Sequence, residues 1–154
     1  MKYLIILFGM FFSISSFANE SLINEQNLIG QWSCSTAFQI DKLDIVEVSS
    51  ISFQANGSST QVGVGYYKDI ADRAKLEYNI SSSWSLNDNI LKFYKAKMNQ
   101  HFFNNPIFNK KYHITEQLLK SIDEEHDYEV LNLTDTLLVI RPIGYDLTEV
   151  CRKL

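Results

Sequence analysis

The sequence predicts an all-β protein, a single antiparallel up-and-down barrel of eight or nine strands, and three observations lead to this fold class. Runs of alternating apolar and polar residues, each about the length of one strand, follow one another along most of the chain. Asparagine, aspartate and glycine stand between many of these runs, where turns need them. Residues that favour strands are abundant, and alanine is scarce. Consecutive antiparallel strands in this number close into a barrel, which leaves no exposed sheet edge.

Residues 1–18 are predicted to be a secretory signal peptide. Lys2 precedes an apolar run from Tyr3 to Phe12, and Ser16–Ala18 matches the small-x-small rule for cleavage. The apolar run is shorter than the roughly 20 residues of a membrane-spanning helix. We therefore expect a periplasmic or secreted protein with no membrane span, whose single domain comprises residues 19–154.

The net charge limits the classes of partner, and the two cysteines predict a disulfide. A net charge of −4 without a basic stripe disfavours nucleic acid and anionic membrane surfaces. In an oxidising compartment, Cys34 and Cys151 indicate one disulfide between the first and last strands, and neither has the spacing of a zinc ligand. Cys34 shares a face with Trp32, whereas Cys151 shares one with Glu149 and Lys153. We therefore expect a bulge or an outward bridge at this point.

A polar leader with a short turn of helix, Asn19–Leu28, precedes the first predicted strand, Ile29–Phe38. The second strand, Ile45–Gln54, changes the phase of its apolar residues. Its two valines have one parity, and the isoleucine and phenylalanine that follow have the other. Such a change indicates an extra residue in the strand, so we expect a β-bulge or a sharp bend at Ser49–Ser50.

Ser59–Tyr67 is the third predicted strand, with Tyr66 on its inner face and two glycines on its outer face. The sequence does not decide whether Asp69–Lys75 forms a helical turn or a loop. Leu76–Leu86 has the cleanest alternation in the chain, which predicts one buried and one solvated face. An Asn-Asp-Asn turn then leads into Ile90–Lys97, and these two strands are expected to form a hairpin.

The region after this hairpin mixes loop, helix and strand signals. Met98–Lys110, rich in asparagine and phenylalanine, is predicted to be a long loop and a candidate mouth or lid of the barrel. Lys111–Ile122 contains both a helix opening and a strand-like start, and we favour a strand that ends in a turn. The last strands are expected at Tyr128–Leu133, Thr136–Arg141 and Asp146–Lys153.

The first strand also carries a family resemblance. Gly30 and Trp32 form a Gly-x-Trp motif at its start, and the last strand is expected to return to it. This pattern resembles the bacterial lipocalin-like domains, barrels of the lipocalin or calycin type. The resemblance implies that the indole lies across the closed end of the barrel and that an arginine of a late strand, Arg152 before Arg141, packs on it. Three further segments are similar: Ile51–Gly57, Trp84–Leu91 and Leu133–Leu138.

Candidate catalytic and metal-binding residues are few. His101, His113 and His126 lie on separate segments without ligand spacing. The mainly acidic run Asp123–Asp127 lacks the spaced oxygens and the turn glycine of a calcium loop, so we interpret it as a solvated turn. No serine has a nucleophile-elbow pattern. We therefore expect no enzyme activity, no metal and no cofactor.

Large side chains of inward parity are the candidate ligand-binding residues. In an eight-stranded barrel such side chains either fill the interior or line a site for one small ligand, and the sequence leaves both possibilities open. A ligand site would be centred on Trp84, with Met98–Lys110 at its mouth. The candidate residues are Phe53, Tyr66, Tyr78, Ile80, Trp84, Phe93, Phe102 and Phe103.

Two functions follow from these patterns. The first is an exported barrel that binds a small hydrophobic ligand in its interior. The alternative is a filled barrel that binds a protein, as an inhibitor or immunity module acting on a hydrolase, with Phe102 and Phe103 outermost. A cavity in the structure favours the first function, and a filled interior with an exposed aromatic loop favours the second.

Overall fold

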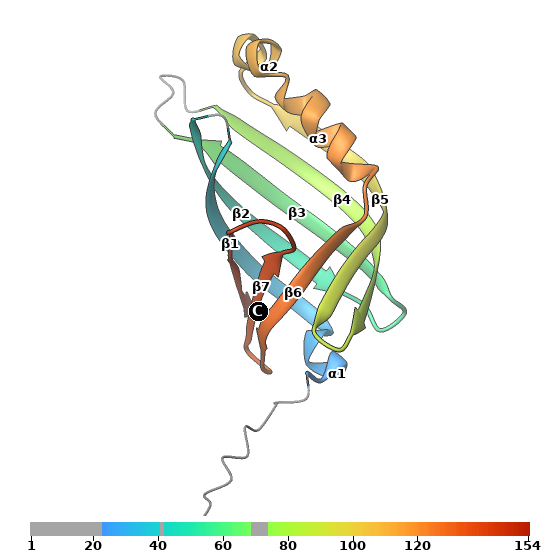
Figure 1. Ribbon diagram of the computed structural model, residues 1–154. Helices are drawn as coiled ribbons and strands as arrows, with labels where there is room; N and C mark the ends of the chain where they lie inside the picture. Colours follow the sequence, from blue (N-terminus) through green and yellow to red (C-terminus); the bar gives the residue numbers. More distant parts are fainter. Residues whose placement is uncertain (1–22, 41, 69–73) are drawn as a thin grey trace, which may run out of the picture.

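The computed structural model describes residues 23–40, 42–68 and 74–154. Eight strands form one closed antiparallel barrel, in which each strand pairs with its sequence neighbours and β8 returns to β1 (Figure 1). The fold is therefore all-β and lipocalin-like, as the sequence predicted. The predicted signal peptide, residues 1–18, and residues 69–73 of the unassigned segment Asp69–Lys75 lie outside the described residues.

The elements follow one another in a simple order. A short helix, α1, precedes the first strand, and two helices, α2 and α3, stand between β5 and β6. The hairpin expected from the cleanest alternation is the β4–β5 pair, closed between Asn87 and Ile90. The bounds are α1 Glu25–Leu28, β1 Gly30–Ile40, β2 Leu43–Phe53, β3 Ser58–Tyr67, β4 Lys75–Asn87, β5 Ile90–Phe103, α2 Pro106–Tyr112, α3 Ile114–Ile122, β6 His126–Leu133, β7 Leu137–Pro142 and β8 Glu149–Lys153.

Strand β2 has no bulge or bend at Ser49–Ser50, and that prediction is wrong. Its register with β1 and with β3 runs without a shift. One face of β2 points inward throughout, and this face carries the polar side chains of Glu47 and Ser49 between its buried apolar residues. Val48 lies on the outer face, with 45% of its surface exposed. The apparent phase change therefore arose because polar residues face the interior and valines face outward.

Strand β3 turns the opposite face inward from the one predicted. Tyr66 lies on the outer face with 46% of its surface exposed, so its predicted inward orientation is wrong. Gly63 and Gly65 face the interior instead. Gly63 stands opposite Tyr78 of β4, and a Cβ atom at this position would collide with the phenol ring. The glycine therefore makes room for a large inward side chain on the neighbouring strand.

The segment Met98–Lys110 is not a loop. Strand β5 continues to Phe103, and α2 begins three residues later. Asn105 caps this helix, because its side chain accepts a hydrogen bond of 2.9 Å from the backbone N–H of Phe108. The asparagine residues that suggested a loop thus include a helix cap.

The segment Lys111–Ile122 is mainly helical, and the predicted strand is wrong. His113 has the left-handed conformation (φ 54°) and separates α2 from α3. In α3 the buried or half-buried residues Ile114, Leu118 and Ile122 recur every four positions, which is the spacing of one helix face. This apolar face decides the conformation, because it packs on the barrel.

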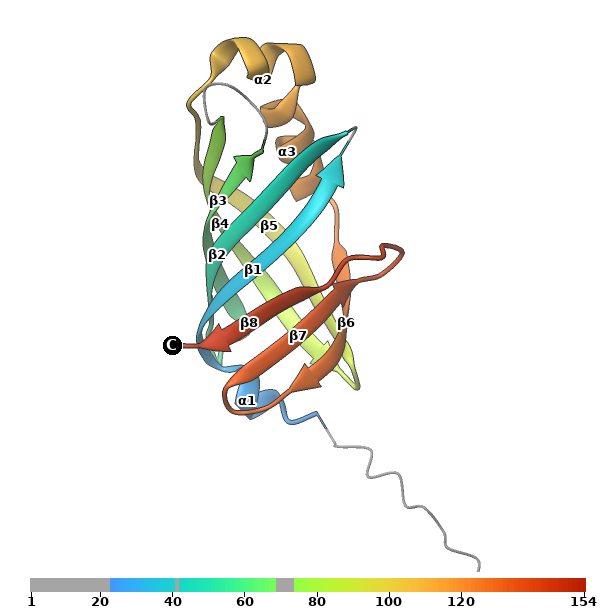
Figure 2. The same cartoon turned by 90° about the vertical axis from the view of Figure 1, so that its left-hand side faces the viewer.

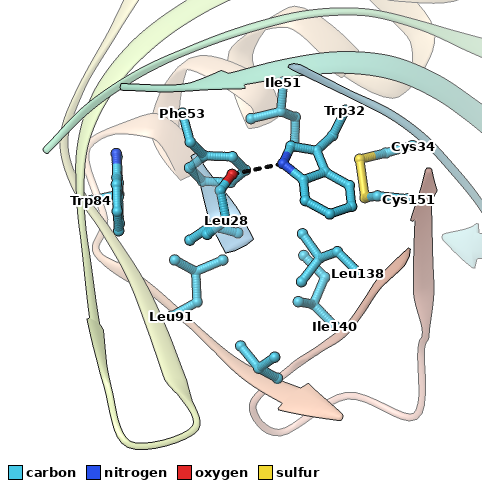
Figure 3. Close-up of a cluster of buried hydrophobic side chains, with 11 residues drawn as sticks. Leu28, Trp32, Cys34, Ile51, Phe53, Trp84, Leu91, Leu138, Ile140 and Cys151 are labelled. Carbon is cyan, nitrogen blue, oxygen red and sulfur yellow. Dashed lines mark hydrogen bonds between the residues drawn. A yellow bond between two sulfur atoms is a disulfide. The ribbon is translucent and has the colours of Figure 1, made fainter. Parts of the chain in front are cut away.

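A hydrophobic cluster closes the lower end of the barrel (Figure 3). Helix α1 lies beneath it (Figure 1), and Leu28 at the end of this helix is fully buried. Trp32 is also fully buried, and its indole N–H donates a hydrogen bond of 2.7 Å to the Leu28 carbonyl. The cluster comprises Leu28, Trp32, Cys34, Ile51, Phe53, Trp84, Leu91, Val130, Leu138, Ile140 and Cys151.

Lys153 is the cation that lies over Trp32, and the predicted arginine is wrong. The Lys153 ammonium is 5.2 Å from the centre of the indole ring, whereas Arg152 faces outward and is exposed. Gly30 has a φ of +127°, and a Cβ there would come within 2.9 Å of the Lys153 Cε. Arg141 forms an ion pair with Glu129, away from the indole.

The predicted disulfide between Cys34 and Cys151 is confirmed. The two residues stand opposite each other where β1 pairs with β8, and both are buried. No bulge interrupts this pairing, and the bridge points inward, so the expected bulge or outward bridge is wrong. The reason is that Glu149 and Lys153, which share the face of Cys151, also point into the barrel.

The upper part of the barrel is covered by helices. Strand β8 pairs with β1 only from Trp32 to Ser35, and β6 pairs with β5 only from Ile90 to Phe93. Above these ladders, α2 and α3 lie at the end opposite α1 (Figures 1 and 2). A second hydrophobic cluster joins them to the strands and comprises Ile45, Tyr67, Ala74, Leu76, Phe108 and Ile114.

Candidate functional site

A cavity of about 240 Å³ lies inside the barrel. It is lined by residues of the strands β2 to β8 and of α3. The lower hydrophobic cluster contributes Ile51 and Ile140 to its lining, and α3 contributes Ser121 and Ile122. The barrel is therefore packed at its closed end but not filled throughout. The polar lining residues are Glu47, Gln61, Tyr78, Ser82, Ser121, His126, Tyr128 and Glu149.

Three of these side chains form a hydrogen-bonded chain across β2, β3 and β4. The Tyr78 phenol passes the inward-facing Gly63 and donates a hydrogen bond to Oε1 of Glu47. The Gln61 amide donates to the Tyr78 oxygen at 3.0 Å. Burial raises the pKa of the Glu47 carboxyl, and the hydrogen bond from Tyr78 offsets part of this effect. Burial and the Glu47 charge raise the pKa of Tyr78 well above its ordinary value, so the phenol keeps its proton.

Glu149 projects into the same cavity from the inner face of β8. Burial, and then the charge of Glu47, raises the pKa of its carboxyl to about 7. Within the described ranges its carboxylate has neither a hydrogen-bond donor nor a cationic partner. The residue is half-buried, and an interior-facing carboxyl without such partners is uncommon, because the charged form loses hydration that the protein does not replace.

Strand β6 forms the opposite wall of the cavity. The His126 ring nitrogen Nε2 lies 2.7 Å from the carbonyl oxygen of Ser121, which joins β6 to the end of α3. Tyr128 packs edge to face against Phe93, with ring centres 5.6 Å apart. Burial, followed by the charges of Glu149 and Glu47, raises the pKa of the Tyr128 phenol. Aromatic rings and carboxylates thus face the same space.

One group of potential metal ligands occurs in the part of the chain that the structure describes. It consists of Cys34, Cys151 and Glu149, whose ligand atoms lie within 4.8 Å of one another. The two sulfur atoms are bonded to each other and are therefore not the thiolates that bind a metal. This group does not fit a metal ion.

The sequence-predicted ligand-binding residues separate into three groups. Tyr78, Ile80 and Phe93 line the cavity. Phe53 and Trp84 belong to the lower cluster, where their rings meet edge to face, while Phe103 packs on the upper cluster. The remaining two residues, Tyr66 and Phe102, face outward and are exposed.

Sequence reasoning missed the charged and amide residues of the site. Glu47, Gln61 and Glu149 are absent from the predicted site residues, because charged and amide side chains are usually exposed. A signal for one of them was present. Glu149 lies two residues before Cys151, so an inward bridge required an inward carboxylate.

Fold and site together define a lipocalin-like barrel with a partly polar interior cavity. No protein-family model matches the sequence, and no curated protein matches it. Solved structures with a similar fold include a lipocalin-like protein from Bacteroides uniformis, at 16% identity and a TM-score of 0.46 over 83% of this chain and 99% of that one. An uncharacterized protein from Bacteroides eggerthii is 18% identical, with a TM-score of 0.42 over 82% and 98% of the two chains.

Proposed function

We propose that the protein binds a small molecule inside its barrel, in the cavity between β2, β4, β6 and β8. The observation that carries this proposal is that the interior is not filled, although the closed end is packed around Trp32. A filled barrel was the expectation for a protein-binding inhibitor or immunity module. The cavity therefore favours a small-molecule ligand over that alternative.

The size and walls of the cavity limit the ligand. Its volume of about 240 Å³ is below the range of roughly 300–1,000 Å³ for pockets that hold drug-sized molecules, so the ligand is compact. Ile80, Phe93 and Ile140 supply an apolar wall, which suits a hydrophobic body. Glu47 and Glu149 require a polar group on the same ligand.

The second part of the proposal is that the protein is exported. The Cys34–Cys151 disulfide is typical of an oxidising compartment, and residues 1–18 have the pattern of a signal peptide. Among the described helices, none is long and apolar enough to cross a membrane. A periplasmic or secreted binding protein is consistent with these features.

Filling the cavity tests the proposal. Ala96 lines the cavity from β5, and the neighbouring Lys97 is exposed on the outer face. We expect Ala96→Trp to abolish ligand adducts in native mass spectrometry after incubation with a small-molecule extract of the host compartment. Lys97→Trp, which adds the same side chain outside, should retain them. Equal adducts in both variants, or none in the wild-type protein, would overturn the proposal.

A further inference from the structure

We propose that the ligand of this cavity is an organic cation, a small amine with an apolar body, whose ammonium group binds between Glu149 and Glu47. This inference rests on the proposed function and names the ligand class of the same site. The two carboxylates enter the cavity from β8 and β2, the strands on either side of β1. Tyr78 occupies one oxygen of Glu47, which leaves Glu149 as the main receiving group.

Four cations of the described chain do not neutralise Glu149, because each of them binds another group. Lys153 donates to the Asn27 carbonyl at 2.9 Å and lies over Trp32. Other cations pair with carboxylates that do not line the cavity: Lys75 with Glu77, Lys92 with Glu125, and Arg141 with Glu129. Buried charges in proteins are normally paired, so an unpartnered carboxylate facing a cavity indicates a partner that enters from outside.

The geometry favours an ammonium over a metal ion. A metal requires several ligand atoms around one point, and no group of His, Asp or Glu atoms in the described chain meets this condition without the bonded cysteine sulfurs. An ammonium needs only one or two acceptors and benefits from aromatic faces nearby. Tyr128 and Phe93 supply such rings in the cavity that Glu149 enters, while Ile80 and Ile140 suit an alkyl body.

Binding of an ammonium should depend on pH, because it requires the ionised carboxylate. The titratable groups that share the cavity with Glu149 are Glu47 on β2, Tyr78 on β4, and His126 and Tyr128 on β6. Burial and the Glu47 charge raise the pKa of Glu149 to about 7, so its ionised fraction falls about tenfold for each pH unit below that value. The affinity for an amine should fall in parallel between pH 7 and pH 5.

Three six-carbon probes test the charge of the ligand: hexylamine, hexanol and hexanoate. Their alkyl bodies match, and hexylamine stays charged from pH 5 to pH 8, since alkylammonium groups titrate near 10. In isothermal titration calorimetry at pH 8, we expect hexylamine to bind at least tenfold more tightly than hexanol, and hexanoate not to bind. At pH 5 the advantage of hexylamine over hexanol should disappear.

Two variants assign this advantage to Glu149. Glu149→Gln keeps the shape of the side chain but removes its charge, so hexylamine should bind no more tightly than hexanol at any pH. The control is Glu77→Gln, which removes a glutamate paired with Lys75 outside the cavity and should retain the full preference. The pH dependence of the wild-type protein tests the same point without a substitution.

The possible failures are distinguishable. If hexanol binds and hexylamine binds no more tightly at pH 8, or if Glu149→Gln keeps the preference for the amine, the cation inference is overturned while the proposed ligand cavity stands. The cation inference would also be overturned if hexanoate bound more tightly than hexylamine at pH 8. If none of the three probes binds the wild-type protein at either pH, two claims are overturned. One is the cation inference, and the other is the proposal that this cavity binds compact apolar molecules.

Discussion

Glu149 and Lys153 lie on the inner face of β8, on either side of Cys151, and meet different surroundings. The Lys153 ammonium has a carbonyl acceptor and an indole face, so its charge is compensated. The Glu149 carboxylate has no comparable partner among the residues described. One charge therefore stabilises the closed end, whereas the other lowers stability when it ionises.

Replacing Glu149 by glutamine should change how stability depends on pH. The pKa of Glu149 is about 7 in the folded protein against an ordinary value of 4.5, so the folded state binds this proton more tightly. Its effect on stability is most favourable below pH 4.5 and is lost as the pH rises through 7. The difference corresponds to up to about 3 kcal/mol. Urea titrations should show Glu149→Gln stabilised at pH 8 and nearly unchanged at pH 4, and an equal change at both values would contradict this.

Lys153→Met should destabilise the closed end more than Arg152→Met. The first substitution removes a cation over Trp32 and a hydrogen bond to Asn27, together worth about 1–2 kcal/mol. The second alters an exposed residue and should change the free energy of unfolding by less than about 0.5 kcal/mol. Chemical denaturation of both variants compares them directly. A larger loss in Arg152→Met would restore the arginine as the residue that supports the indole.

Helix α3 completes the barrel where strand pairing ends. Its residues Ile114 and Leu118 border a second pocket of about 290 Å³ with Ile45 and Tyr67, and Ser121 borders both this pocket and the interior cavity. The helix thus lies between the cavity and the upper end of the barrel.

Leu119→Pro should unfold α3 without unfolding the barrel. Leu119 lies in the helix interior, where proline removes a hydrogen bond and costs about 3 kcal/mol. Hydrogen exchange followed by mass spectrometry should become faster in peptides that cover α3 and stay slow in β1 to β3. Leu119→Ala is the control, with exchange close to the wild type. Loss of protection throughout the barrel would show that α3 is part of one cooperative core.

The elements differ in how well their sequences predicted them, and the cause lies in the faces they present. The strand Leu76–Leu86 has one apolar and one polar face, so its alternation predicted β4 correctly. Strand β2 carries Glu47 inside and Val48 outside, and the same rule failed there. Helix α3 is too short for local propensity to decide, and packing on the barrel determined it. The site was predicted only where its residues are apolar or aromatic, as with Tyr78 and Phe93.

The whole barrel depends on joining its first and last strands. Four residue pairs of β1 and β8 stand in register, and the disulfide lies among them, joining cysteines 117 positions apart in the sequence. The disulfide therefore both joins the first and last strands of the barrel and restricts the unfolded chain. It lies next to the cavity.

Replacing both cysteines by alanine should lower the free energy of unfolding substantially. The chain-entropy treatment gives about 4–5 kcal/mol for a loop of this length, as an upper value. Urea titrations of the wild-type protein and of Cys34→Ala/Cys151→Ala measure the difference. The loss should be matched by reducing the wild-type protein with a thiol. Identical stability of the oxidised and reduced proteins would contradict the proposed contribution.

Isoleucine methyl NMR tests most directly whether the barrel interior binds a small molecule. Ile51, Ile80 and Ile140 line the cavity, whereas Ile107 and Ile143 are exposed, at 83% and 53% of their surface. During titration with hexylamine and with hexanol, we expect the methyl signals of the first three residues to shift together and saturate, and those of the other two to stay in place. Shifts confined to Ile107 and Ile143, or no saturable shift with either probe, would contradict a ligand site inside the barrel.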